Sequence, residues 1–247
     1  MSSAPTASLQ RFAYTEAIAR QLELVLARQR GETPDGVWYL EHHPVVTWNP
    51  GRGRQHLLVS EEDLALRGVA LEACDRGGDV TYHGPGQLVG YPIVDLSSAT
   101  PPSRDLHAYL RTLEDALIDA LRSWEIVGTH SETGTGVWVP ERGDSARPAK
   151  IAAMGVRVRK WVSSHGFALN VSCDLTPFRD LIVPCGIASA GVTSLSERLG
   201  DSPHGVLPGG FPVETADAVE PVHRALEARL GRPLARTYNG KDWWVDE

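Results

Sequence analysis

The chain has 247 residues, of which 42% are hydrophobic and 22% charged, and its net charge is −7 at pH 7. These proportions are typical of a globular protein with a buried core. The acidic balance argues against nucleic acid as a partner, because nucleic-acid binding needs a basic surface. No apolar run approaches the roughly 18 residues that a membrane span needs, so we expect no membrane association. The first ten residues lack a basic segment followed by an apolar one, so we expect no secretory signal.

Three cysteines, Cys74, Cys173 and Cys185, form a small and odd-numbered set without metal-ligand spacing. His42, His43 and His165 do not complete a metal-binding pattern with any cysteine or carboxylate, so we expect no metal. Free thiols are typical of a reducing compartment. The sequence therefore predicts a cytoplasmic protein.

The first half of the chain combines one long helix with short strands. Apolar residues at helical spacing predict a helix over residues 14–30, which ends at Gly31. The segment Ser60-Glu61-Glu62-Asp63 resembles a capping sequence and predicts a short helix that ends at Gly68. Strands are expected over residues 37–40, 45–48, 69–74 and 88–96.

The second half is predicted to hold two further helices. Ser103 is expected to cap a helix that reaches Trp124, and its buried stripe consists of Leu106, Leu110, Leu113, Leu117 and Leu121. Residues 215–230 also have helical spacing, but Pro221 predicts either a kink or a start near Glu220. The charged segment 141–149 is expected to form a surface loop. Strands are expected over residues 125–127, 136–139, 150–162 and 166–171.

Helices and strands are mixed without regular βαβ alternation. This order favours an α+β fold with a mixed, mainly antiparallel sheet flanked by helices. No linker, internal repeat or low-complexity segment divides the chain. We therefore expect one domain over residues 1–247.

Cys185 lies in a Pro-Cys-Gly sequence, between Pro184 and Gly186. Proline stiffens the backbone, and glycine permits a tight turn that exposes amide donors suited to an oxyanion. These neighbours favour a nucleophile, although a lone cysteine is as often a small buried apolar residue. Cys173 is followed by an aspartate and Cys74 ends an apolar segment, so both are expected to be structural.

Lys150 opens a predicted strand and is followed by small residues over 151–155, which leave room for a flat or linear ligand. At pH 7 a thiol with a pKa of about 8.5 is about 3% ionised, and a nearby cation that moves the pKa to about 6.5 gains more than about tenfold in thiolate. Lys150 is therefore a candidate to activate Cys185. The alternative is an exposed lysine at a strand end.

A glycine-rich loop over residues 77–87 contains four glycines and His83. It lacks the dinucleotide-binding spacing, which fails at Val89, and the chain has no P-loop sequence. His83 is an acid or base, an oxyanion donor, or a structural imidazole. The glycine loop, Lys150 and Cys185 together indicate an acyltransferase.

These motifs resemble the bacterial lipoyl (octanoyl) transferase family. The matching segments are residues 76–78, 81–89, 91–93, 150–158, 165–170 and 184–187. An earlier segment, Glu41-His42 with Pro44-Val45, is similar too, although Trp48-Asn49 replaces the usual Leu-Gly. The likeness covers about residues 14–199, with residues 200–247 as an extension of the same domain. Several ordered motifs are more specific than any one of them.

The resemblance implies the fold of biotin and lipoate protein ligases and a first step of protein lipoylation. An octanoyl group would pass from octanoyl-acyl carrier protein to one lysine of a lipoyl domain, without a cofactor. Acceptors would be the lipoyl domains of 2-oxoacid dehydrogenase complexes and the glycine cleavage H protein. Cys185 would carry the acyl thioester, and Lys150 would lower the pKa of its thiol. The implied substrate-binding residues are Arg76, Gly77, Gly78, Asp79, Val80, Thr81, Tyr82, His83, Ala153, Met154, Gly155, Gly166, Phe167 and Ala168.

Two other functions remain open. The first is an ATP-dependent lipoate or biotin ligase, because residues 51–54 (Gly-Arg-Gly-Arg) are superficially similar to an adenylate-binding loop. The second is a lipoyl-domain binding module without catalysis. An adenylating enzyme needs no nucleophilic cysteine, and a binding module is expected to lack Cys185 or Lys150. Both residues are present, which favours the transferase.

Overall fold

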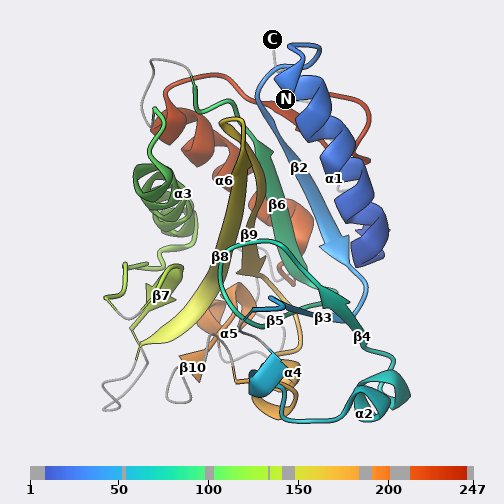
Figure 1. The fold of residues 1–247 in the computed structure, drawn as a ribbon. Helices are drawn as coiled ribbons and strands as arrows, with labels where there is room; N and C mark the ends of the chain where they lie inside the picture. The colour runs from blue at the N-terminus through green and yellow to red at the C-terminus, as the bar shows by residue number, and fades with distance from the viewer. Residues whose placement is uncertain are drawn as a thin grey trace.

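The computed structural model describes residues 9–51, 54–97, 103–132, 134–140, 148–183, 191–200 and 212–243. Within them, an eight-stranded sheet forms the centre of the molecule (Figure 1). Its four long strands pair antiparallel in the order β2 (Gly36–His42), β6 (Gln87–Ile93), β9 (Val162–Asn170) and β8 (Ala149–Arg159). The predicted α+β fold with a mixed, mainly antiparallel sheet is confirmed.

Short strands extend this sheet and build a second one. Three of them pair in parallel with a long strand: β1 (Arg11–Phe12), β10 (Gly191–Val192) and β11 (Ala235–Thr237). Strand β7 (Val137–Val139) pairs antiparallel with β8. The second sheet has the order β4 (Ala70–Ala73), β3 (Val45–Trp48) and β5 (Thr81–His83). Strand β5 corrects the prediction that residues 77–87 form only a loop.

Helices cover both faces of the main sheet. Helix α1 (Tyr14–Gln29) lies on one face, and α3 (Leu106–Leu121) and α6 (Thr215–Leu230) pack together on the other (Figure 1). Alternate residues of β2 serve the two faces: Val37 and Tyr39 belong to the core under α3 and α6, and Trp38 and Leu40 belong to the core under α1. This is the two-residue period of a strand buried on both sides.

The remaining helical elements are short. They are η1 (Arg54–His56), α2 (Glu61–Leu66), η2 (Arg122–Trp124), α4 (Thr176–Asp180) and α5 (Leu195–Leu199). The capping prediction for α2 is confirmed, because the Ser60 side chain accepts a hydrogen bond from the Asp63 amide. For α3 the predicted cap is wrong. Asp105 caps that helix by accepting from the amides of His107 and Ala108, at 2.9 and 3.0 Å.

Two predicted strands end or fail where residues adopt a positive φ angle. Residues 125–127 form no strand, because Glu125 has a φ of 58° that ends η2. The strand expected over residues 150–162 stops at Arg159, since Lys160 and Trp161 have φ angles of 49° and 65°. This two-residue connection joins β8 to β9 as a tight hairpin. Lysine and tryptophan do not favour the left-handed region, so the sequence here did not indicate a turn.

Helix α6 begins at Thr215 and continues through Pro221 to Leu230. The predicted start near Glu220 is therefore wrong. Leu226 and Leu230 are fully buried in the core shared with α3, which offsets the cost of an interior proline. Together with the pairing of β11 and β2, this packing joins the C-terminal segment to the main sheet. The domain extent, residues 1–247, stays a prediction.

Two further sequence predictions concern the surface loop over residues 141–149 and membrane spans, and the structure describes only part of the residues involved. Of the expected surface loop, residues 141–147 lie outside them, and Ala149 is already part of β8. No helix in the described part of the chain combines the length and the apolar character that a bilayer crossing requires.

Candidate active site

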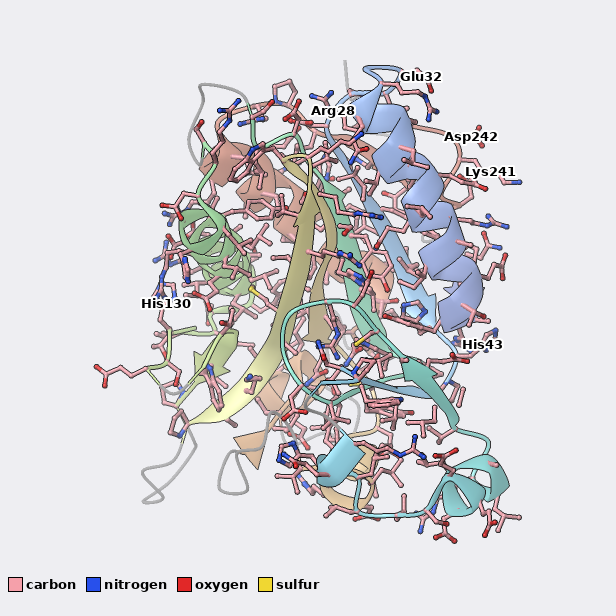
Figure 2. All side chains as sticks on the ribbon, viewed as in Figure 1. Arg28, Glu32, His43, His130, Lys241 and Asp242 are labelled. Atoms are coloured by element: carbon pink, nitrogen blue, oxygen red, sulfur yellow. The ribbon has the colours of Figure 1, made fainter. Side chains whose placement is uncertain are left out.

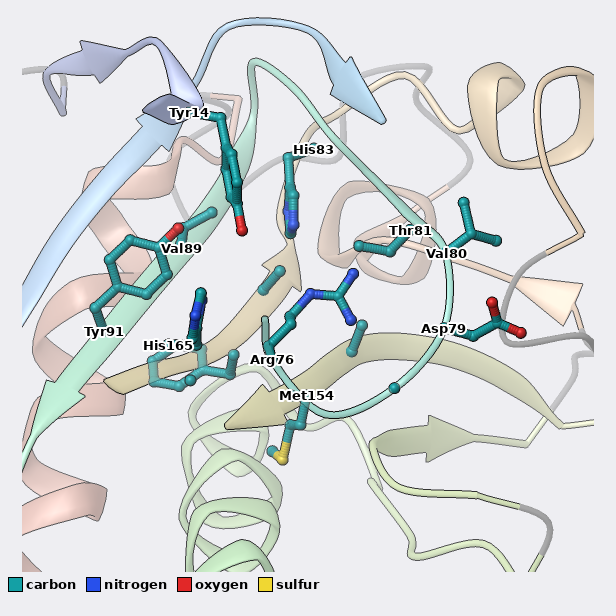
Figure 3. Close-up of a pocket in the computed structure, with 16 residues that line it drawn as sticks. Tyr14, Arg76, Asp79, Val80, Thr81, His83, Val89, Tyr91, Met154 and His165 are labelled. Atoms are coloured by element: carbon teal, nitrogen blue, oxygen red, sulfur yellow. The ribbon is translucent and has the colours of Figure 1, made fainter. Parts of the chain in front are cut away.

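A cavity lies between the main sheet and the loop that connects β4 to β5 (Figure 3). The loop crosses in front of β8 and β9, where it covers the face on which α1 packs (Figure 1). Walls come from this loop, from β6, β8 and β9, and from Tyr14 at the start of α1. Segments far apart in the sequence therefore meet at one apolar site.

Most of the predicted substrate-binding residues line this cavity. They are Arg76, Gly78, Asp79, Val80, Thr81, His83, Ala153, Met154, Gly155, Gly166, Phe167 and Ala168. Gly77 and Tyr82 do not. The Gly77 amide donates to the Val156 carbonyl at 3.1 Å, and the Tyr82 ring packs on Phe178 at 5.5 Å between centroids. Alternation along β5 explains Tyr82, because its neighbours Thr81 and His83 point to the opposite side.

Four further lining residues were not predicted: Tyr14, Val89, Tyr91 and His165. Val89, Tyr91 and His165 belong to the family-like segments, so their place in those motifs was an available signal. Tyr14 is the first residue of a helix and carries no comparable signal. Only the packing of α1 on the sheet brings its ring to the cavity (Figure 3).

The loop is tied to the sheets by Asp75 and Arg76. Asp75 accepts a hydrogen bond from His165 Nε2 at 2.8 Å and forms an ion pair with Arg157. The Arg76 guanidinium donates to the Thr47 hydroxyl at 2.9 Å, and the Arg76 carbonyl accepts from the Asn49 side chain at 3.1 Å. Asn49, one of the two departures from the family pattern, thus supports the loop.

The small residues of β8 and β9 serve two different purposes. A Cβ atom on Gly155 would lie 2.5 Å from the Gly77 carbonyl oxygen, and one on Gly166 would collide with the Gly90 carbonyl. These glycines let other backbone segments approach β8 and β9. The prediction that small residues leave room for a ligand therefore fits Ala153 better than Gly155.

A chain of hydrogen bonds assigns the tautomer of His83. The Thr193 carbonyl can only accept, and it accepts from Asn170 Nδ2 at 3.0 Å. Asn170 Oδ1 therefore accepts from Gln87 Nε2 at 2.9 Å, which leaves Gln87 Oε1 to accept from His83 Nδ1 at 2.7 Å. Burial, with His42 and Arg76 nearby, lowers the pKa of His83 well below its usual value. His83 is thus neutral with an unprotonated Nε2, which does not supply the donor that an oxyanion needs.

Lys150 is buried at the start of β8, outside the lining of this cavity. Its Nζ donates to the Thr135 carbonyl at 3.0 Å and lies 4.7 Å from the centre of the Trp138 ring. The alternative of an exposed strand-end lysine is wrong. Cys185 and the rest of its motif, residues 184–187, lie outside the described residues, as do Arg52 and Gly53 of the suggested adenylate loop.

Comparison with known proteins identifies the family. The model of the lipoyl protein ligase A/B catalytic domain matches residues 13–207. The chain belongs to this family. An octanoyltransferase of Koribacter versatilis is 48% identical over 189 residues, which cover 76% of this chain and 73% of that protein. An octanoyltransferase of Rubrobacter xylanophilus is 47% identical over 189 residues, 76% of this chain and 80% of that protein. The chain is accordingly an enzyme, an acyltransferase.

Solved structures of lipoate protein ligases share the fold. A bipartite ligase of Thermoplasma acidophilum aligns with a TM-score of 0.67 at 15% identity and covers 93% of this chain and 84% of its own. A lipoate-protein ligase A bound with ATP aligns with a TM-score of 0.63 at 15% identity, over 94% of this chain and 89% of its own. The expectation of a biotin/lipoate protein ligase-like fold is confirmed.

The two cysteines within the described residues are unsuited to acyl transfer. Cys74 and Cys173 are both free and buried. Burial, with a smaller contribution from the Asp174 carboxylate, raises the pKa of Cys173 to about 12. Its thiol therefore stays protonated at neutral pH, and the main cause is burial rather than the neighbouring aspartate noted in the sequence.

In the described part of the chain, no group of three or more His, Cys, Asp or Glu side chains could hold a metal ion.

Proposed function

We propose that this acyltransferase moves an octanoyl group from octanoyl-acyl carrier protein to one lysine of a lipoyl domain. Cys185 carries the acyl group as a thioester, and Lys150 activates its thiol. Acceptors are the lipoyl domains of 2-oxoacid dehydrogenase complexes and the glycine cleavage H protein, and the reaction takes place in the cytoplasm without ATP or metal.

The cavity between the β4–β5 loop and the sheet carries this proposal. Its walls include the apolar residues Val80, Val89 and Ala168, which suit an alkyl chain. The relatives of Koribacter versatilis and Rubrobacter xylanophilus are octanoyltransferases, which favours an octanoyl chain. The bipartite ligase of Thermoplasma acidophilum forms a lipoylation system with its E2 lipoyl domain, which supports a lipoyl domain as acceptor here.

The chemistry proceeds through two exchanges at one acyl carbon. The Cys185 thiolate attacks the donor carbonyl, a new carbon–sulfur bond forms, and the carrier's sulfur leaves and is protonated. The amine of the acceptor lysine then attacks this thioester, the amide bond forms, and the Cys185 sulfur leaves as a thiolate. The Lys150 ammonium gives its proton to the leaving carrier sulfur, and the neutral Lys150 amine then takes the proton that the acceptor amine loses. The donor thioester is already activated, so neither step needs a nucleotide.

The decisive experiment mixes the protein with octanoyl-acyl carrier protein, EDTA and no nucleotide. Intact-mass analysis is expected to show an octanoyl adduct that hydroxylamine removes, and addition of a lipoyl domain is expected to transfer it. The adduct is expected to persist in Cys74→Ser and Cys173→Ser and to be absent in Cys185→Ser. Retention of the labile adduct in Cys185→Ser would contradict the assignment of the nucleophile.

A second mixture tests the ligase alternative. Free octanoate with ATP and magnesium is expected to give no octanoylated lipoyl domain. Activity in this mixture alone would replace the transferase proposal by a ligase in which residues 51–54 bind the adenylate.

A further inference from the structure

A single peptide bond lies between the carboxylate of Glu114 and the ammonium of Lys150. The Thr135 carbonyl accepts from Lys150 Nζ at 3.0 Å. The next amide, that of Gly136, donates to Glu114 Oε1 at 2.8 Å. The carbonyl and the amide belong to the same planar unit and point in opposite directions when the bond is trans. The two charged side chains therefore hold this peptide from its two sides.

Burial makes both hydrogen bonds strong. Glu114 is 5% exposed and Lys150 is 8% exposed. Each bond has a charged partner, and such bonds are shorter and stronger than neutral ones. A carboxylate at the amide and an ammonium at the carbonyl polarise the peptide in the same sense, so each bond strengthens the other. Loss of the carboxylate therefore weakens the hold on Lys150.

Glu114 is itself held by the surface of α3. Its second oxygen, Oε2, forms an ion pair with Arg111 Nη1 at 3.0 Å and lies 3.3 Å from His130 Nδ1. His130 lies beside α3 at the edge of the molecule (Figure 2). The carboxylate thus has one oxygen for Arg111 and His130 and one for the buried peptide.

Gly136 makes the close approach to Lys150 possible. Its φ angle is 133°, which side chains rarely adopt. A Cβ atom there would lie 2.6 Å from the Ala152 carbonyl oxygen and 3.2 Å from Lys150 Cε. The lysine stem therefore lies directly against the glycine, with the Trp138 ring near the ammonium.

We propose that Glu114 is a positioning residue for Lys150 and acts through the Thr135–Gly136 peptide. This inference rests on the proposed role of Lys150 in activating Cys185. Glu114 fixes the peptide plane, and the carbonyl of that plane fixes the ammonium. The sequence motifs do not include Glu114, which lies in the middle of a helix.

The experiment compares Glu114→Ala, Glu114→Gln and Lys150→Ala with wild type. It measures the pH dependence of iodoacetamide alkylation at Cys185, quantified by mass spectrometry of the labelled peptide, together with kcat and KM. Asp119→Asn is the matched control: it removes a carboxylate from the same helix, and Asp119 pairs with Arg122 and Arg229 instead. Thermal unfolding of each variant shows whether the fold is kept.

We expect Glu114→Ala to move the alkylation profile to higher pH, towards that of Lys150→Ala, and to lower kcat about tenfold. KM is expected to change less, because the acyl cavity is untouched. Glu114→Gln keeps an acceptor oxygen for the Gly136 amide and is expected to restore most of the profile. Asp119→Asn is expected to match wild type.

A Glu114→Ala profile that matches wild type while that of Lys150→Ala shifts would overturn the positioning role and leave the proposed function intact. Equal defects in Glu114→Gln and Glu114→Ala would overturn the hydrogen-bond mechanism. If Lys150→Ala itself leaves the profile unchanged, the role of Lys150 fails, and the positioning role fails with it.

Discussion

The Tyr91 hydroxyl donates a hydrogen bond to His42 Nε2 across 2.7 Å, in the wall of the cavity beneath the β4–β5 loop. The direction follows from the other ring nitrogen, since His42 Nδ1 lies 3.2 Å from the Phe12 carbonyl, which can only accept. Tyr14 lines the same cavity, but its buried hydroxyl has no hydrogen-bond partner among the described residues. The two tyrosines therefore form a matched pair with opposite hydrogen-bonding states.

This contrast predicts opposite effects on stability. Tyr14→Phe removes an unpaired buried hydroxyl, so the free energy of unfolding is expected to stay unchanged or to rise by about 1 kcal/mol. Tyr91→Phe leaves His42 Nε2 without its donor, so a loss of about 1–3 kcal/mol is expected. Urea unfolding of the ligand-free protein measures both values. Equal losses in the two variants would mean that a bound water satisfies the Tyr14 hydroxyl.

The tautomer of His83 is a second prediction. Nitrogen-15 NMR at pH 7 is expected to show a neutral ring with the proton on Nδ1, because Gln87 Oε1 can only accept. Gln87→Leu removes this acceptor and is expected to release the tautomer preference. A wild-type ring protonated at Nε2, or at both nitrogens, would contradict the assigned chain of hydrogen bonds.

Stability is predicted to fall in mild acid because of His42 and His83. Burial lowers the pKa of His42 to about 4, and it lowers the pKa of His83 well below its usual value. Unfolded histidine binds a proton near pH 6.5, so below that pH the unfolded state binds more protons than the folded state. The stabilisation is complete above pH 6.5 and is lost as the pH falls towards 4.

The slope of this loss approaches about 1.4 kcal/mol per pH unit for each such histidine. Urea unfolding between pH 7 and pH 4 measures the slope. His42→Gln is expected to reduce this slope by the contribution of one histidine, up to about 1.4 kcal/mol per pH unit. A free energy of unfolding that stays constant over this range in wild type would show that these rings titrate normally.

Lys150 is predicted to lower the pKa of the Cys185 thiol and to take up the proton that the acceptor lysine loses. Lys150→Ala is expected to raise the pH at which iodoacetamide alkylates Cys185 and to slow turnover strongly. Lys150→Arg keeps a cation, so it is expected to keep part of the alkylation profile. It is not expected to recover turnover, because a guanidinium does not give up its proton. An unchanged pH profile of alkylation in Lys150→Ala would show that Lys150 does not affect the Cys185 thiol.

Local patterns in the sequence were sufficient for the elements whose stability is decided locally. The spacing in α1 and the Ser60–Asp63 cap of α2 depend on residues one to four positions apart, and both predictions are confirmed. The family-like segments also named most of the cavity lining, because their residue types match a motif. The short strands β1 and β11 had no such signal, since pairing with β2 stabilises them.

The sequence by itself determined the family, the α+β class and the segments that build the cavity. Only the tertiary structure decided which other side chains join them there. Tyr14 reaches the cavity because α1 packs on the sheet. Glu114 of α3 is linked to Lys150 of β8 through the Thr135–Gly136 peptide, which belongs to neither α3 nor β8. These contacts join residues 15 or more positions apart, so they form only when strand pairing and helix packing bring the segments together, and no local spacing in the chain encodes them.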